Sequence, residues 1–192
     1  DSIILNNFID YIKNHKNIEN ETEFSLANKL YNERKKHKNF ICNSFDTISA
    51  FNENAAIIHY NTINNVKFHN DIVIEDKTKK ISSNGLYLID SGGQFLYGTT
   101  DTTRTILIGK PKQEWIENYT LVLKGHIALA TAVFKKGTSG KMLDVLARQF
   151  LNQANLDYAH GTGHGIGFCL SVHEGKGLGI SSGANVILQE GM

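Results

Sequence analysis

Residues 85–109 read Gly-Leu-Tyr-Leu-Ile-Asp-Ser-Gly-Gly-Gln-Phe-Leu-Tyr-Gly-Thr-Thr-Asp-Thr-Thr-Arg-Thr-Ile-Leu-Ile-Gly, and this stretch decides the fold. The pattern predicts a strand, a Ser-Gly-Gly turn, a second strand, a short break at residues 98–100 and a third strand through Ile108. Asp90 and Asp101 each end or interrupt an apolar run. A lone carboxylate in such a position is costly to bury unless a cation or a hydrogen-bond network compensates it.

Two explanations of these carboxylates are open. In the first, Asp90 caps the turn that follows it, while Asp101 pairs with Arg104. In the second, carboxylates from adjacent strands hold one divalent cation or bridge two. Hard oxygen ligands suit Mn²⁺, Mg²⁺ or Ca²⁺, and an added imidazole shifts the preference toward transition metals. The pair alone favours the first explanation, so the second depends on whether histidines join the aspartates.

Three histidines lie in a glycine-rich run near the end of the chain: His160, His164 and His173. The glycines around the first two argue against a helix, so their spacing is not that of the helical two-histidine zinc motif. In an extended chain His160 and His164 fall on one face, and the glycines leave the backbone open to close approach. Strand histidines are commonly hydrogen-bonded core or surface residues, so the run predicts chemistry only in combination with the aspartates.

Composition indicates a globular protein with one substantial core. Hydrophobic residues make up 41% of the 192, and 20 Lys and Arg balance 19 Asp and Glu. This balance gives no electrostatic case for a nucleic-acid or membrane partner, and residues 34–38, a basic run, are interpreted as a solvated helix end. No apolar run reaches membrane-spanning length. Cys42 and Cys169 match no metal or redox spacing, which favours a cytoplasmic protein.

Periodicity predicts alternating groups of helices and strands. The expected elements are helices at 3–13 and 23–36, strands at 45–50 and 55–60, a loop or insertion at 61–84, the hairpin, helices at 113–135 and 141–154, and strand and loop to the end. Ser2 and Thr22 are the expected N-caps of the first two helices. Pro111 is expected to open the third helix and Gly137 to close it. No repeat or linker divides the chain, so one domain or part of one is expected.

The ordered set of motifs resembles the pita-bread metallopeptidases, and within them the Xaa-Pro aminopeptidases. The matching segments are Ala56-Ile-Ile-His-Tyr60, Tyr87-Leu-Ile-Asp-Ser-Gly92, Gly98-Thr-Thr-Asp-Thr-Thr-Arg-Thr105, Val122-Leu-Lys-Gly-His-Ile-Ala128, His160-Gly-Thr-Gly-His-Gly-Ile-Gly167 and Val172-His-Glu-Gly175. They occur in the family's order, and only residues 61–84 depart from it by their length. The resemblance implies an α+β pita-bread fold, in which helices flank a mixed antiparallel sheet that is truncated here at the C-terminus.

The resemblance also implies a role for each matching residue. Asp90 corresponds to a ligand of one metal, Asp101 to a carboxylate that bridges two, and His164 to the imidazole ligand of the other. The residues that match histidines of the substrate site, where they position the peptide and shuttle protons or stabilise the tetrahedral intermediate, are His59, His160 and His173. The implied cofactors are two divalent ions, with Mn²⁺ favoured and Co²⁺ or Zn²⁺ as alternatives. Hydrolysis by such a pair needs no covalent intermediate.

The family completes its metal site with residues that would lie outside this chain. Two glutamates, one of them the general base, follow the last histidine motif, and the chain stops at Met192 before them. We therefore expect residues 1–192 to be a partial catalytic domain, without an upstream N-terminal domain and the downstream strands. This piece alone should bind metal poorly and hydrolyse nothing, whereas the full-length protein is expected to form a homodimer.

The leading hypothesis is a cytoplasmic, dinuclear-metal aminopeptidase that acts on peptides with proline at the second position. It would hydrolyse the bond between the N-terminal residue and that proline. A prolidase, which is restricted to Xaa-Pro dipeptides, is the nearest alternative. A non-catalytic relative that uses the fold to bind a peptide or protein is the alternative from another class, and the presence of all six site residues argues against it.

Overall fold

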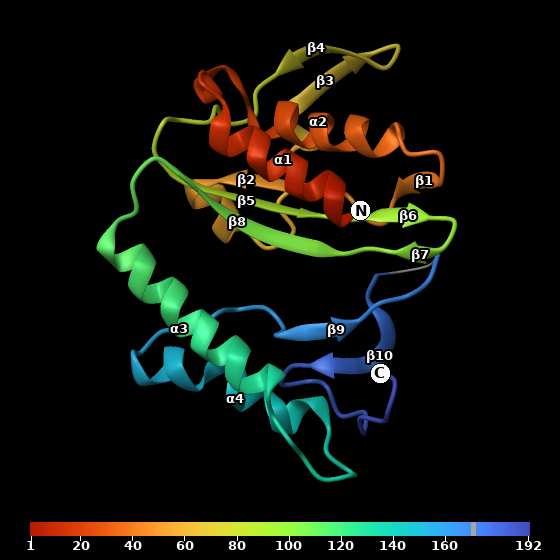
Figure 1. The fold of residues 1–192 in the computed structure, drawn as a ribbon, viewed down its shortest axis with the longest axis vertical. Coiled ribbons are helices and arrows are strands. Elements are labelled where there is room, and N and C mark those ends of the chain that lie inside the picture. The colour runs from red at the N-terminus through yellow and green to blue at the C-terminus, as the bar shows by residue number, and fades with distance from the viewer. Residues whose placement is uncertain (170–171) are drawn as a thin grey trace. The chain divides into compact units, whose positions relative to one another are not determined.

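Residues 85–109 supply the central strand β5 and the edge strand β8 of a three-stranded antiparallel sheet with the order β2-β5-β8 (Figure 1). The structure is a computed structural model that describes residues 1–169 and 172–192. The three strands are β2 (Ile48–Phe51), β5 (Gly85–Ser91) and β8 (Thr102–Ile108). Burial alternates along β5, so one face of the sheet packs into a core while the other stays half-buried. The predicted hairpin is therefore present, and its two faces differ.

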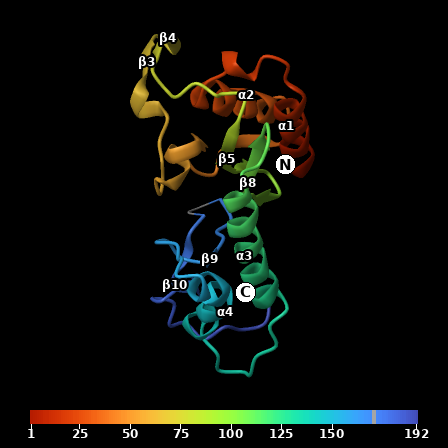
Figure 2. The same cartoon turned by 90° about the vertical axis from the view of Figure 1, so that its left-hand side faces the viewer.

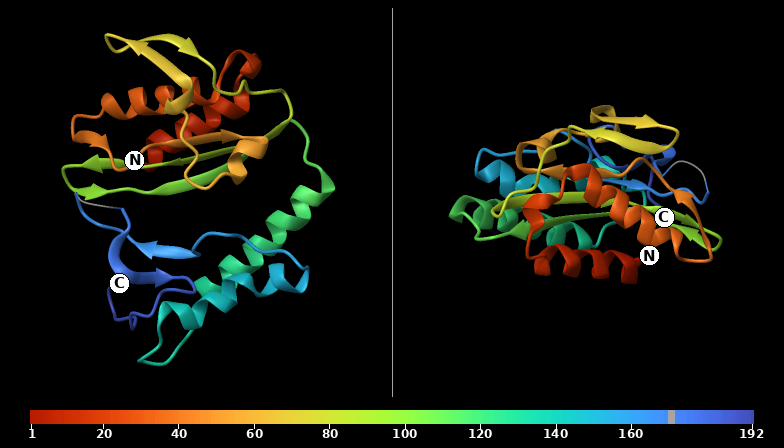
Figure 3. Two further views of the ribbon diagram at one scale, coloured as in Figure 1. Left: turned by 180° about the vertical axis from the view of Figure 1, so that it is seen from behind. Right: turned by 90° about the horizontal axis from the view of Figure 1, so that it is seen from above.

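Helices α1 (Ser2–Asn14) and α2 (Glu23–Lys35) run along the buried face of this sheet (Figures 1 and 3). The buried core comprises Leu5, Phe8, Ile12, Ile18, Leu26, Leu30, Phe51, Ile81, Tyr87, Ile89, Ile106 and Ile108. Thr22 caps α2 as predicted, because its Oγ1 accepts a hydrogen bond from the Ser25 amide at 3.0 Å. The predicted Ser2 cap is wrong, since Ser2 is already helical and Asp1 is the N-cap.

The rest of the first compact unit, Asp1–Lys110, consists of short elements around this layer. They are β1 (Phe40–Asn43), β6 (Gly93–Phe95) and β7 (Gly98–Thr99) in one sheet, the hairpin of β3 (Val66–His69) and β4 (Ile72–Asp76), and the 3₁₀ helices η1 (Ile18–Asn20), η2 (Asn52–Ala56) and η3 (Ile63–Asn65). The β3–β4 hairpin lies beyond α2 (Figure 2). Residues 61–84, expected to be a loop or insertion, thus contain an ordered hairpin.

The predicted strand at residues 55–60 is wrong. That segment contains the end of η2 and a turn, because a buried carboxylate draws it toward α2. Glu23 accepts hydrogen bonds from the Phe51 amide at 2.7 Å and from Asn54 Nδ2 at 2.9 Å. It also accepts one from Tyr60 Oη at 2.8 Å. Three partners within ten residues of chain bend the segment around one side chain, which an extended strand does not allow.

The second compact unit, Pro111–Met192, is described by itself. Helices α3 (Gln113–Ala130) and α4 (Gly140–Gln153) pack side by side, and β9 (Gly163–Gly165) pairs antiparallel with β10 (Glu174–Ile180) (Figure 2). The helices approach closely at Gly125, where a Cβ would lie 2.0 Å from the Ala147 carbonyl oxygen.

The C-terminal end of α3 differs from the prediction. The helix begins at Gln113, as predicted, two residues after Pro111, but it ends at Ala130, well before Gly137. Thr131 is the C-cap, and its amide donates to the Ile127 carbonyl at 3.0 Å. In the described ranges, no helix is long and apolar enough to cross a membrane.

Candidate functional site

Asp90 and Asp101 belong to the half-buried face of the β5–β8 pair. Asp90 pairs with Thr103 in the strand register, and β8 begins opposite Ser91 with Thr102. When this register is continued by one residue, Asp101 becomes the diagonal neighbour of Asp90 on the same face. Both aspartates are half-buried, and Oδ1 of Asp90 is buried. The continued register therefore assigns Asp90 of β5 and Asp101, the residue just before β8, to one face, opposite the face that the helices cover.

Gly92 allows the chain segments that carry the two aspartates to come close together. A Cβ at this position would lie 1.9 Å from the Thr100 carbonyl oxygen and 2.2 Å from Ser44 Oγ. The Ser44 hydroxyl donates to that same Thr100 carbonyl at 2.7 Å. Any side chain at position 92 must push this arrangement apart, so the spacing of Asp90 and Asp101 depends on the glycine.

A buried ion pair lies on the helix side of the same hairpin. Arg34 donates from Nε and Nη2 to the two carboxylate oxygens of Asp1 at 2.9 and 3.0 Å, and the side chains are 0% and 4% exposed. Arg34 Nη2 also donates to Ser91 Oγ at 3.0 Å, and Thr100 Oγ1 donates to Asp1 Oδ2 at 2.7 Å. These two hydroxyl residues adjoin the two aspartates in sequence. The pair therefore anchors the backbone beside both carboxylates.

The sequence interpretation of residues 34–38 as a solvated helix end is wrong at Arg34, which is fully buried, although Lys35 and Lys36 are exposed. Burial lowers the pKa of Arg34 to about 10, which leaves the guanidinium charged at neutral pH. The sequence contains a feature that indicates the burial of Arg34. Arg34 continues the helical stripe of Ala27 and Leu30, and a charged residue on a buried stripe requires a partner.

Arg104 does not take the position expected of a counter-charge for Asp101. It pairs with Ile89 in the strand register, so alternation sets it on the face opposite Asp101. Its side chain is exposed, and Nη1 donates to the Thr103 carbonyl at 2.7 Å. This geometry does not favour the explanation in which Arg104 neutralises the aspartate.

His59 lies in the turn that follows η2 in the first unit. Its φ of 56° places a non-glycine residue in the left-handed region, where the backbone is strained. The next residue, Tyr60, donates its hydroxyl to Glu23, and burial together with this hydrogen bond raises the pKa of Tyr60 to about 12. The hydroxyl therefore stays protonated near neutral pH, and the buried carboxylate holds the turn that presents the exposed histidine.

His164 and His173 contact each other in the second unit. Their ring centroids are 4.3 Å apart at an interplanar angle of 80°, an edge-to-face arrangement. His164 lies in β9, and its Nδ1 is 2.9 Å from the Gly165 carbonyl oxygen. Because a carbonyl only accepts, Nδ1 must carry the proton, and Nε2 carries the lone pair of the neutral ring.

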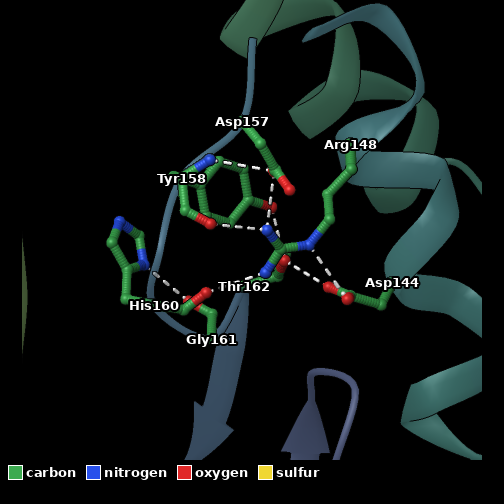
Figure 4. A network of polar contacts seen from close by, with 7 residues as sticks. All are labelled: Asp144, Arg148, Asp157, Tyr158, His160, Gly161 and Thr162. Carbon is green, nitrogen blue, oxygen red and sulfur yellow. Dashed lines mark hydrogen bonds and ion pairs between the residues drawn. The ribbon is translucent and has the colours of Figure 1, made fainter. Parts of the chain in front are cut away.

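His160 lies in the segment before β9, and it is held there by a network centred on Arg148 of α4 (Figure 4). Arg148 donates from Nη2 to the His160 carbonyl and from Nη1 to the Tyr158 carbonyl, each at 2.7 Å. It also bonds two carboxylates, those of Asp144 at 3.0 Å and Asp157 at 2.7 Å. Burial lowers the pKa of Arg148, but the hydrogen bonds that it donates to the two carboxylates outweigh this effect and raise its pKa.

The six predicted site residues are thus placed unit by unit. Asp90, Asp101 and His59 belong to the first unit, and the other three histidines to the second. The structure brings the two aspartates to one face and His164 to His173. In residues 1–169 and 172–192, no three His, Cys, Asp or Glu side chains gather in a group that could hold a metal ion. The sequence did not predict the two arginines that anchor these segments.

Curated relatives of the chain include probable Xaa-Pro aminopeptidases. The probable Xaa-Pro aminopeptidase P of Pyricularia oryzae is 51% identical over 171 residues, which cover 88% of this chain and 26% of the relative. The probable Xaa-Pro aminopeptidase P of Podospora anserina is 52% identical over 158 residues, with coverages of 82% and 22%. The chain therefore spans about a quarter of the length of these relatives.

Solved structures of an aminopeptidase and of a prolidase also match the chain. An X-prolyl aminopeptidase from Caenorhabditis elegans, described as a cytosolic enzyme with a di-nuclear active site, matches with a TM-score of 0.79 and 39% identity. That match covers 94% of this chain and 28% of the other. A prolidase from Thermococcus sibiricus matches with a TM-score of 0.77 and 26% identity over 99% of this chain and 46% of its own.

The family comparison agrees with the resemblance inferred from the motifs. The family model described as metallopeptidase family M24 matches residues 1–192, the whole of the chain. The helices and antiparallel sheets of both units are those expected of this fold. The chain belongs to metallopeptidase family M24 and has its pita-bread fold.

Proposed function

We propose that the protein is a dinuclear-metal aminopeptidase that hydrolyses the bond between an N-terminal residue and a following proline. The observation that carries this proposal is the pair of aspartates on one face of the β5–β8 hairpin, in a chain 51% identical to a probable Xaa-Pro aminopeptidase P. We further propose that residues 1–192 are part of the catalytic domain of a longer cytoplasmic protein that forms a homodimer. The cytosolic relative from Caenorhabditis elegans supports the location.

The donor set fits a pair of divalent ions. Asp90 of β5 and Asp101, just before β8, would supply carboxylate oxygens, and His164 would supply Nε2, because its Nδ1 lies 2.9 Å from the Gly165 carbonyl oxygen. We assign Asp90 to one metal, Asp101 to a bridging position and His164 to the other metal. Mixed oxygen and nitrogen donors suit Mn²⁺, with Co²⁺ or Zn²⁺ as alternatives. When bound, the metal pair supplies Lewis-acid activation of water and of the scissile carbonyl.

The remaining histidines would handle the peptide. We assign His59, His160 and His173 to the substrate site, where they position the peptide and exchange protons with the leaving amine. His160 has its Nδ1 2.8 Å from the Gly161 carbonyl oxygen, so in the neutral ring Nε2 is the nitrogen that accepts a proton. A fixed tautomer of this kind lets one nitrogen act repeatedly as acceptor and donor.

The test is peptide hydrolysis by the Mn²⁺-loaded full-length protein. We expect release of the first residue from an Xaa-Pro-Yaa tripeptide, and little release from the Xaa-Ala-Yaa tripeptide that serves as its matched control. An Xaa-Pro-Yaa peptide left uncut by the metal-loaded protein would overturn the proposal. Binding of that peptide without cleavage would instead favour a non-catalytic peptide-binding protein.

A prolidase is the second candidate function. The prolidase from Thermococcus sibiricus has a TM-score of 0.77 against this chain, so the fold serves both activities. Its 26% identity is well below the 51% of the curated aminopeptidase from Pyricularia oryzae, which favours the aminopeptidase. Comparing turnover of Xaa-Pro dipeptides and Xaa-Pro-Yaa tripeptides separates the two, because a prolidase cleaves only the dipeptide.

A further inference from the structure

We propose that Arg148 is a positioning residue, whose guanidinium fixes residues 157–162 and thereby sets the orientation of His160 in the substrate site. This inference rests on the proposed function, because its catalytic consequence depends on the role assigned to His160. No residue of α4 belongs to the six predicted site residues, and this network is what connects the helix to His160.

All three nitrogens of the Arg148 guanidinium donate hydrogen bonds. Nε of Arg148 binds Asp144, one turn earlier on α4, and this i−4 contact sets the plane of the guanidinium. Nη1 then reaches both the Asp157 carboxylate and the Tyr158 carbonyl, while Nη2 reaches the His160 carbonyl. A lysine supplies one charged nitrogen and cannot address these positions together.

Ring stacking extends this control from the backbone to the imidazole. The Arg148 guanidinium lies 3.9 Å from the centroid of the Tyr158 ring. The same ring stacks on His160 with centroids 4.8 Å apart and an interplanar angle of 28°. Figure 4 shows the Tyr158 ring between the guanidinium and the imidazole. The arginine thus acts on the histidine through its carbonyl and through the tyrosine.

Thr162 connects the network to the strand that carries His164. Its hydroxyl contacts the Tyr158 hydroxyl and donates to Asp144 Oδ1 at 2.5 Å. Asp144 is buried, and its two oxygens therefore serve Arg148 and Thr162 separately. The Thr162 amide donates to the Ile180 carbonyl of β10 at 2.8 Å, just before β9 begins. Loosening Arg148 should therefore affect His160 more than His164, which is held by the strand pairing.

The test is a double-mutant cycle in the Mn²⁺-loaded full-length protein with Arg148→Lys and His160→Ala. We expect Arg148→Lys to lower kcat by roughly 10- to 100-fold with KM little changed, because a displacement of about 1 Å can cost that much. If Arg148 acts through His160, adding Arg148→Lys to His160→Ala causes no further loss. A loss of the same size in both backgrounds, or wild-type kcat for Arg148→Lys, overturns the inference.

A second readout does not depend on activity. Hydrogen exchange of the amides of residues 158–162 should speed up at least about tenfold in Arg148→Lys, since the hydrogen bonds that close this segment are lost. Leu151→Ala, at a buried position of α4 outside the network, serves as the control for general destabilisation and should not speed up exchange in residues 158–162 more than in α4 itself. Asp157→Asn, at an exposed position, is the milder variant if Arg148→Lys folds poorly.

The two readouts separate the possible failures. Unchanged exchange in Arg148→Lys overturns the inference whatever the enzyme does. If His160→Ala is fully active, or if the metal-loaded protein cleaves no peptide, the proposed function is at fault. Faster exchange confined to residues 158–162 in that case still supports the positioning of this segment by Arg148.

Discussion

The aspartate hairpin of the first unit and the histidine segment of the second are anchored by arginines in different environments. Arg34 and its partner Asp1 have side chains 0% and 4% exposed, whereas Arg148 is 15% exposed and one of its carboxylate partners, Asp157, is 54% exposed. Breaking a buried ion pair leaves an uncompensated charge, but water can replace lost partners at a partly exposed site. The more deeply buried anchor thus lies behind the two aspartates that we propose as metal ligands.

The largest effect should come from the aspartates themselves. In the full-length protein, Asp101→Asn is expected to lower kcat/KM for an Xaa-Pro-Yaa peptide by at least about 10³-fold, because it removes charge from the proposed bridging position and metal activation contributes several kcal/mol. Asp71→Asn, in the exposed turn between β3 and β4, is the matched control and should keep wild-type activity. A small decrease in kcat/KM for Asp101→Asn would contradict the proposed role of Asp101 as a bridging metal ligand.

Measuring the free energy of unfolding tests whether the buried anchor at Arg34 contributes more stability than the partly exposed anchor at Arg148. Arg34→Met leaves Asp1 buried without its partner and should lower the free energy of unfolding by about 3–5 kcal/mol. Urea denaturation of the full-length protein at neutral pH measures the change. Combining Arg34→Met with Asp1→Asn should recover part of the loss, since the uncompensated charge is then removed. A cost below about 1 kcal/mol for Arg34→Met would contradict the role of the buried pair.

Substitutions at two glycines test whether the close approach at Gly92 sets the spacing of the two aspartates. Gly92→Ala forces a Cβ toward the Thr100 carbonyl and should cost about 1–3 kcal/mol of stability, with weaker metal binding. Gly98→Ala adds a Cβ in open space and serves as the control. Isothermal titration with Mn²⁺ compares the two variants, and equal affinities would show that the spacing at position 92 does not matter for the metal.

The smallest stability effect is expected at the partly exposed anchor. Arg148→Met should lower the free energy of unfolding by only about 1–2 kcal/mol, because solvent can satisfy much of what the guanidinium leaves behind. Urea denaturation under the conditions used for Arg34→Met gives the comparison directly. A loss as large as that of Arg34→Met would end the distinction between the two anchors.

Much of the fold could be predicted where local pattern and tertiary contacts agree. The hairpin at residues 85–109 follows its own alternation, and the core stripes of α1 and α2 coincide with their helical period. These features place Asp90 on one strand and Asp101 at the start of its neighbour without any knowledge of the rest of the chain. Thr22 was predictable as a cap for the same reason, since its partner Ser25 lies within one turn.

The failures occurred where a distant partner overrides the local pattern. Ile57 and Ile58 favour a strand, but the Glu23 carboxylate bends their segment from a position more than thirty residues earlier. Arg34 is followed by exposed lysines, and the group that buries it, Asp1, is equally remote in sequence. The Arg148 network was missed because it joins a helix to a loop through backbone carbonyls. Every residue has such a carbonyl, so residue types in the sequence do not indicate which carbonyls the arginine will bind.

The most direct test of the account is the number of Mn²⁺ ions that the full-length protein binds. Elemental analysis after gel filtration should find two ions per chain in the wild-type protein and in Asp71→Asn, and none in Asp101→Asn, because a bridging carboxylate serves both metals. Two ions retained by Asp101→Asn would contradict the bridging role, and a wild-type protein with one ion or none would contradict the dinuclear site itself.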